Sequence, residues 1–175
     1  MTIGIDTYYR SDSDAYTVGV IFDSWTDKVP KQIISCKTSE FAPYIPGEFY
    51  KRELPCILDL LKLVDLEEID TIILDGFLRL RDMEGHDKDG LGLHLKEVLG
   101  DKCPKLIGVA KTEFGKCHEI SEEVVRGKAK VPLYVQGYGM SDKEAACLIK
   151  NMYGPYRIPD ILKILDKETK KKEGL

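Results

Sequence analysis

The order of strand-like and helix-like patterns is the feature that most restricts how this chain can fold. Three runs with many β-branched and aromatic residues come first, at 2–6, 15–23 and 31–37. Short polar segments separate them, as expected for an antiparallel meander. The apolar residues then recur at helical spacing, and later runs alternate between helix and buried strand. We therefore predict an α/β fold with a mixed sheet, three antiparallel strands followed by parallel strands, and flanking helices.

The later elements are expected at defined positions. The helix over 49–64 contains Pro55, which lacks a backbone donor, so the regular helix should begin or kink there. A capping box formed by Ser141 and Glu144 opens another helix, and the last one starts near Pro159. Further buried strands are expected at 71–75, 105–110 and 133–136, and a further helix at 91–99. The charged residues 170–175 should fray, and the whole chain, 1–175, is expected to be a single domain.

Composition excludes several classes of protein. With 43% hydrophobic and 32% charged residues, the chain is typical of soluble globular proteins. Its five scattered cysteines predict neither a disulfide framework nor a zinc site and favour a reducing, cytoplasmic location. Neither a signal-peptide pattern nor a run of about 20 apolar residues is present, so no membrane contact is expected. The net charge of −4 means that nucleic-acid binding would need a local basic patch.

Three carboxylates stand where an apolar side chain or a turn would be usual. Asp6 and Asp75 each end an apolar strand, and ligands of α/β sheets gather beyond the carboxyl ends of parallel strands. Glu53 lies on the apolar stripe of its helix, where a carboxylate is costly unless it is paired or holds a metal. Three such oxygen donors suit Mg²⁺ or Mn²⁺.

Each of these residues also has an ordinary structural interpretation. Asp6 could be a polar strand-edge residue, and Asp75 could simply begin an Asp-Gly turn. Glu53 could be a partly solvated residue of a first helical turn, or it could pair with Arg52. Lys111 follows the strand at 105–110 and could stabilise charge on a phosphate at the same edge, or it could be a solvated strand-end lysine.

The segment 43–55 makes the interpretation more specific. Its sequence, PYIPGEFYKRELP, resembles the signature of the endonuclease V family, in which P-Y-I-P-G leads into R-E-x-P. Further segments resemble that family in the same order and cover most of the chain, at 4–6, 73–76, 90–95, 107–112, 134–144 and 156–159. This resemblance implies a ribonuclease H-like fold, which periodicity alone does not select.

The resemblance also implies an activity and roles for individual residues. The family cuts the backbone 3′ of deaminated purines, chiefly inosine, in DNA or RNA. Asp6, Glu53 and Asp75 would bind Mg²⁺ or Mn²⁺, and Lys111 would complete the catalytic group. Tyr44 would be the wedge that fills the space of a displaced base. The substrate-binding set would be Tyr44, Pro46, Gly47 and Gly76, and we expect the protein to act as a monomer.

Two departures from the family pattern keep other functions open. Phe77 and Leu78 stand where the family has a glycine-containing pocket segment, and Gly139 stands where it has a histidine. Asp142 could replace that histidine or could be an early helix residue. One alternative is therefore a catalytically weakened relative that binds nucleic acid or modified nucleotides without efficient cleavage. Another is a structural or protein-interaction domain that kept only the fold.

Overall fold

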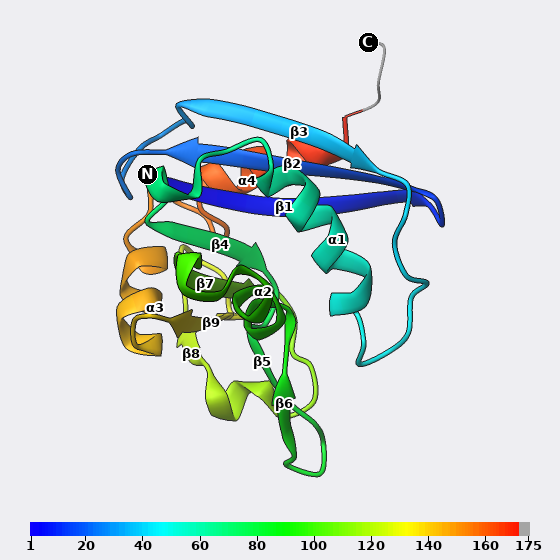
Figure 1. The fold of residues 1–175 in the computed structure, drawn as a ribbon. Helices are drawn as coiled ribbons and strands as arrows, with labels where there is room; N and C mark the ends of the chain where they lie inside the picture. Colours follow the sequence, from blue (N-terminus) through cyan, green and yellow to red (C-terminus); the bar gives the residue numbers. More distant parts are fainter. Residues whose placement is uncertain (172–175) are drawn as a thin grey trace.

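The computed structural model describes residues 1–171 and contains one large mixed sheet (Figure 1). Its seven strands run in the order β3-β2-β1-β4-β7-β9-β8. Their bounds are β1 Thr2–Ser11, β2 Asp14–Phe22, β3 Gln32–Thr38, β4 Thr71–Asp75, β7 Lys105–Ala110, β8 Glu122–Val124 and β9 Leu133–Tyr138. A separate hairpin consists of β5 Arg79–Arg81 and β6 Asp87–Asp89. The helices are α1 Tyr50–Leu61, α2 Leu91–Leu99, α3 Asp142–Lys150 and α4 Asp160–Thr169, with 3₁₀ turns at Leu66–Glu68, Gly100–Lys102 and Cys117–Ile120.

Strand directions confirm the first part of the predicted sheet and correct the last. β1, β2 and β3 are antiparallel neighbours, and β4 and β7 run parallel to β1. The strand expected at 133–136 is present as β9, but it runs antiparallel to β7. A parallel return usually needs a helical crossover. Between β7 and β9 the chain forms only a 3₁₀ turn and β8, which pairs antiparallel with β9.

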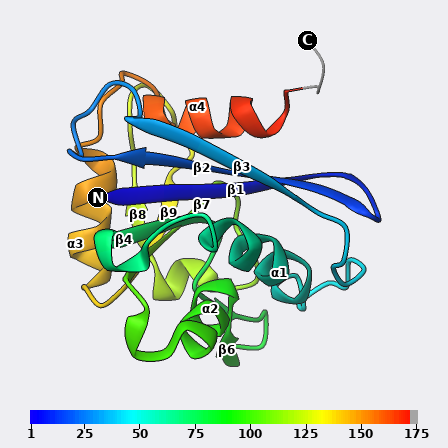
Figure 2. The ribbon, with the colours of Figure 1, turned by 45° about the horizontal axis from the view of Figure 1, so that its top comes forward.

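Helices cover both faces of the sheet (Figure 2). The sheet separates two buried apolar layers, one on each face. α1 and α2 pack on one face, where Ile3, Ile72 and Leu106 are fully buried. α3 and α4 cover the opposite face, where Val20, Ile107 and Val135 are fully buried. Successive residues of a strand point to opposite faces of the sheet, so a strand that is covered on both faces is mostly apolar. Residues 71–74 of β4 are all buried, as the predicted buried strand at 71–75 requires.

Local sequence explains where the helices begin. α1 starts at Tyr50, close to the start of the predicted helical pattern, and includes Pro55, so the regular helix does not begin at the proline. Ser141 and Glu144 form the predicted reciprocal capping box of α3, and Pro159 is the N-cap residue of α4. All five cysteines are free. No helix within 1–171 has both the length and the apolar character needed to cross a membrane.

Strand β1 extends further than the sequence predicted, and this changes the setting of Asp6. Pairing with β4 ends at Ile5 opposite Leu74, whereas pairing with β2 continues to Ser11. Asp6 therefore lies inside a ten-residue strand rather than at its end. It is nevertheless the first β1 residue beyond the parallel register with β4, because β2 supports the longer strand from the other side.

The β5–β6 hairpin was not predicted, since its polar sequence lacks the alternation of a half-buried strand. The hairpin pairs Arg79 to Arg81 with Asp87 to Asp89. At the other end of the chain, the expected frayed tail lies mostly outside the described residues. Lys170 caps α4, and the carbonyl of Lys171 accepts a hydrogen bond from Arg10.

Candidate metal and nucleic-acid site

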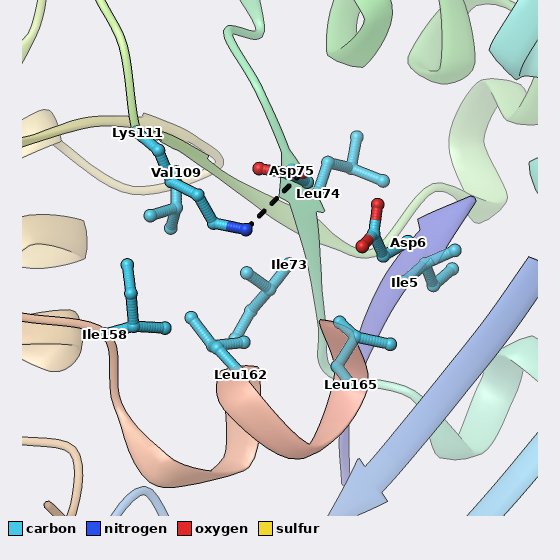
Figure 3. Close-up of a pocket in the computed structure, with 10 residues that line it drawn as sticks. All are labelled: Ile5, Asp6, Ile73, Leu74, Asp75, Val109, Lys111, Ile158, Leu162 and Leu165. Atoms are coloured by element: carbon cyan, nitrogen blue, oxygen red, sulfur yellow. Dashed lines mark ion pairs between the residues drawn. The ribbon is translucent and has the colours of Figure 1, made fainter. Parts of the chain in front are cut away.

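The parallel register of β1 and β4 brings two carboxylates to neighbouring strands. Ile5 is opposite Leu74, so Asp6 and Asp75 follow as the next residue of each strand. Asp75 is also opposite Val109 of β7, two residues before Lys111. The Lys111 Nζ lies 3.8 Å from the Asp75 Oδ2, and Figure 3 shows this ion pair beside Asp6. The pairing of β1, β4 and β7 therefore sets the positions of Asp6, Asp75 and Lys111.

Glu53 completes the group from the helical layer. It lies in the first turn of α1, is 9% exposed, and together with Asp6 and Asp75 lines a small crevice between α1 and the sheet. These three carboxylates and Lys111 also line one larger cavity of about 610 Å³. Tyr44, Gly47 and Gly76 from the expected substrate-binding set line this cavity as well. Pro46 is not among its lining residues.

Burial and mutual repulsion make the ionised forms of these acids unfavourable. Burial, followed by the charge of Asp75, raises the pKa of Asp6 to about 7. Burial also raises the pKa of Glu53 well above its usual value, and Asp75 and Asp6 add to this rise. The pKa of Asp75 is raised by burial, although Lys111 opposes the shift. The backbone N–H of Thr7 donates to Asp6 and partly offsets its shift.

Arg52 does not neutralise Glu53 by direct contact. Within residues 1–171 the Glu53 carboxylate takes part in no ion pair or hydrogen bond, although the charge of Arg52 lowers its pKa. The Arg52 guanidinium instead stacks 4.1 Å from the centre of the Tyr9 ring and 5.2 Å from that of Phe41. The structure therefore disfavours the alternative in which Arg52 and Glu53 form a simple structural pair.

The donor set fits a hard divalent cation. Asp6, Glu53 and Asp75 share one cavity with a single lysine, so a cation with oxygen preference would relieve their repulsion. The fourth carboxylate of the cavity wall, Glu113, lies 2.9 Å from the Nδ1 of His118. Among the described residues, one group of three possible metal ligands has all its ligand atoms within 4.8 Å of one another. This group is Asp82, Glu84 and His86, not the three carboxylates of the cavity. This hairpin-tip cluster is explained by its turn, in which Asp82 accepts from two backbone N–H groups. At least one spacing between the ligand atoms of Asp6, Glu53 and Asp75 is therefore wider than 4.8 Å.

Aromatic and apolar side chains form much of the cavity wall. Tyr44 is 61% exposed at its rim and contacts Phe49 edge-to-face, with 5.7 Å between ring centres. Phe77 lines the cavity, as the departure from the family pattern suggested. Leu78 does not, because it is fully buried beneath the start of α2 and close to Gly92 and Gly108. The remaining aromatic residues of the wall are Tyr9, Tyr50 and Phe114.

Gly139, which stands where the family pattern has a histidine, lies at the opposite end of the β7–β9 pair from the carboxylates. Tyr138 is opposite Leu106 at the start of β7, and a Cβ on Gly139 would lie 3.1 Å from the Lys105 side chain. Asp75 and Lys111 lie at the other end of the same strand pair. A histidine at position 139 would therefore not reach the carboxylates.

Asp142 is also unavailable as a substitute metal ligand. Both of its carboxylate oxygens accept from Arg79 Nη2, at 2.7 and 2.9 Å, and one also accepts from Gly137 N–H. Arg79 is occupied by this contact, and Arg81 pairs with Asp87 and Glu119. These arginines therefore join the hairpin to α3 and to the 3₁₀ turn at Cys117–Ile120.

Two acidic residues near the site were missed in the sequence, Glu113 in the wall of the larger cavity and Asp166 of α4. Asp166 of α4 raises the pKa of both Asp75 and Asp6 by its charge, and both of its oxygens accept from Lys170 at 2.9 Å. The sequence signal was weak, because Asp166 follows the apolar residues Ile164 and Leu165 as any polar-face residue of α4 would. Only the packing of α4 on β1 and β2 brings Asp166 near Asp6 and Asp75.

Comparison with known proteins shows that the fold is similar to several solved structures of endonuclease V. Human endonuclease V is similar over 96% of this chain and 82% of its own, with 22% identity and a TM-score of 0.67. Endonuclease V from Bacillus subtilis covers 96% and 78%, with 19% identity and a TM-score of 0.69. Endonuclease V from Ciona intestinalis, crystallised with DNA containing an inosine, covers 96% and 83%, with 18% identity and a TM-score of 0.70. No protein-family model and no curated protein sequence matches the chain. The expected resemblance is thus confirmed at the level of the fold.

Proposed function

We propose that this protein is a divalent-metal-dependent endonuclease that cuts a nucleic-acid strand 3′ of a deaminated base such as inosine. The observation that carries this proposal is the group of Asp6, Glu53, Asp75 and Lys111 around one cavity. The fold shared with endonuclease V structures, one of them bound to inosine-containing DNA, supports it. An all-carboxylate site beside an aromatic cavity suits phosphodiester hydrolysis next to an unstacked base.

Asp6, Glu53 and Asp75 would hold Mg²⁺ or Mn²⁺. When bound, the cation would activate a water molecule and stabilise negative charge developing on the phosphate. The protein contributes the fixed positions of the oxygens, since two come from neighbouring strands and the third from a helix packed on them. The raised pKa values of Asp6 and Glu53 mean that metal binding at neutral pH would displace protons from these two carboxyl groups.

Lys111 and the cavity wall would bind the strand itself. The Lys111 ammonium lies at the same edge as the carboxylates and would contact the phosphate to be cut. Tyr44 is exposed at the rim and would stack in place of the displaced base. The displaced base would enter the cavity, which Phe77 and Leu80 line on one side. Gly47 and Gly76, both with positive φ, let the backbone turn close to that space.

A second candidate function rests on Phe77. Its ring occupies part of the wall where the family resemblance expected a glycine backbone, so the cavity could bind a modified base without placing its phosphate for cleavage. The missing histidine no longer supports this candidate, because position 139 lies at the opposite end of the β7–β9 pair. The two candidates differ in whether a bound strand is cut.

The test is cleavage of end-labelled DNA and RNA strands that each carry one inosine, with Mg²⁺ or Mn²⁺. We expect a cut just 3′ of the inosine that disappears with EDTA and in Asp75→Asn. The matched control is Asp101→Asn, since Asp101 is exposed in a 3₁₀ turn before β7. Binding of the inosine strand without any product would support the second candidate. Absence of both binding and cleavage by folded protein would reject both candidates.

A further inference from the structure

The backbone of Lys111 is held by a side chain from near the other end of the sequence. Arg157 lies in the loop before α4, and its Nη2 donates to the carbonyl of Lys111 and, at 3.0 Å, to that of Pro132. Its Nε donates to the carbonyl of Val131 at 2.9 Å. Lys111 directly follows β7, and Val131 and Pro132 directly precede β9. One guanidinium thus joins the site end of β7 to the entry of β9.

A second arginine fixes the loop that carries Arg157. Arg126 is 6% exposed, and its guanidinium donates to the carbonyls of Met152, Gly154 and Tyr156 at 2.7, 3.0 and 2.9 Å. A planar group with five donors suits several carbonyls converging from one loop. A shift of the loop would break these hydrogen bonds. The position of Arg157 is therefore defined by the bonds of Arg126 to the loop backbone and by the bonds of its own guanidinium to the strand ends.

Lys111 needs such support because its side chain is not fixed by burial. The side chain is 35% exposed, and its ion pair with Asp75 is 3.8 Å long. A lysine stem has four rotatable carbon–carbon bonds, so the direction of its ammonium depends on the placement of its backbone. Figure 3 shows the Lys111 side chain running from the end of β7 toward Asp75.

We propose that Arg157 is a positioning residue that orients Lys111 toward Asp75 and the phosphate to be cut. This inference rests on the proposed function for the role of Lys111 in cleavage. The alternative is that Arg157 only holds the loop before α4 and affects cleavage through overall stability. The two differ in whether the effect of removing Arg157 depends on the presence of the Lys111 side chain.

A double-mutant cycle separates these roles. Misplacement by about 1 Å can cost about 100-fold in rate, so we expect Arg157→Gln to slow single-turnover cleavage by roughly 10- to 100-fold with little change in KM. In a Lys111→Ala background the same substitution should change the rate by less than about 2-fold, because coupled residues are not additive. Arg157→Lys should not restore the rate, since one ammonium cannot reproduce the fork. Equal slowing in both backgrounds would show a purely structural role.

A second readout tests the inference without nucleic acid or metal. Lysines are reductively methylated with ¹³C-formaldehyde, and the Lys111 signal is identified by its absence in Lys111→Ala. We expect this NMR signal to shift in Arg157→Gln but not in the control Tyr156→Ala, whose side chain is exposed and packs on Lys163. An unchanged Lys111 signal in folded Arg157→Gln protein would overturn the inference. If the wild-type protein cuts no strand, the proposed function fails, while this experiment still decides whether Arg157 orients Lys111.

Discussion

Replacing Asp6 with asparagine should stabilise the metal-free protein at alkaline pH while removing activity. The pKa of Asp6 in the folded protein is about 7, above its ordinary value of 3.8, because of burial and the charge of Asp75. The folded protein therefore keeps a proton that the unfolded chain releases between these two pH values. The stability associated with that proton is fully present below pH 3.8 and is lost as pH rises through 7.

The size of the effect follows from this difference. About three pKa units correspond to about 4 kcal/mol at most, since one unit is about 1.4 kcal/mol. Solvent screening and relaxation of the neighbouring acids reduce the expected gain to about 2 kcal/mol. Asparagine keeps an oxygen that can accept the 2.8 Å hydrogen bond from Thr7 N–H. In a protein of this size, 2 kcal/mol raises Tm by about 4–8 °C.

The assay is thermal unfolding of wild type and Asp6→Asn in EDTA at pH 5 and pH 8. We expect the variant to melt at higher temperature at pH 8 and the difference to shrink at pH 5, where wild-type Asp6 is largely protonated. Saturating Mg²⁺ at pH 8 should raise the Tm of the wild type more than that of Asp6→Asn. A variant with equal or lower Tm at pH 8, or with the same gain at both pH values, would refute the reasoning.

Three further predictions concern individual side chains. Gln136→Ala should destabilise the protein by about 2–4 kcal/mol in urea denaturation, because the fully buried Gln136 accepts from the backbone N–H groups of Leu78 and Arg79; a loss below about 0.5 kcal/mol would contradict this role. Ser141→Ala should cost about 1 kcal/mol in the same assay through loss of the α3 cap, and an unchanged midpoint would show that the cap is dispensable. Tyr44→Ala should leave Tm nearly unchanged, since the side chain is 61% exposed, but should weaken binding to an inosine strand in fluorescence anisotropy, and undiminished affinity would reject the wedge role.

Parallel pairing made two of the site acids recognisable in the sequence. Asp6 and Asp75 each follow a strand-like run, so their meeting at one edge was predictable on the condition that the two strands are parallel neighbours, which the structure shows. Glu53 was predictable because a carboxylate on the apolar stripe of a helix is unusual. The length of β1 was not predictable, because residues 7–11 are held by β2 and not by their own apolar pattern.

Other parts of the site depend on contacts between distant segments. Asp166 comes near Asp6 only because α4 packs on β1 and β2, and nothing in its neighbours distinguishes it from a solvated helix residue. The direction of β9 depends on the connection through β8, which is only three residues long and mostly polar. Asp142 looked available as a ligand, but its bond to Arg79 spans 63 positions of the chain and has no local signal.

Divalent-metal binding by Asp6, Glu53 and Asp75 is the central claim, and calorimetric titration with Mn²⁺ tests it most directly. The proteins compared are wild type, Asp75→Asn and, as a matched control, His86→Ala, which removes the histidine of the exposed cluster with Asp82 and Glu84. Titration at pH 7 in buffers of different ionisation enthalpy would also report proton release. We predict binding with proton release in wild type and His86→Ala, and loss of that binding in Asp75→Asn. Binding that survives Asp75→Asn and disappears in His86→Ala would place the cation at the hairpin tip and contradict the account.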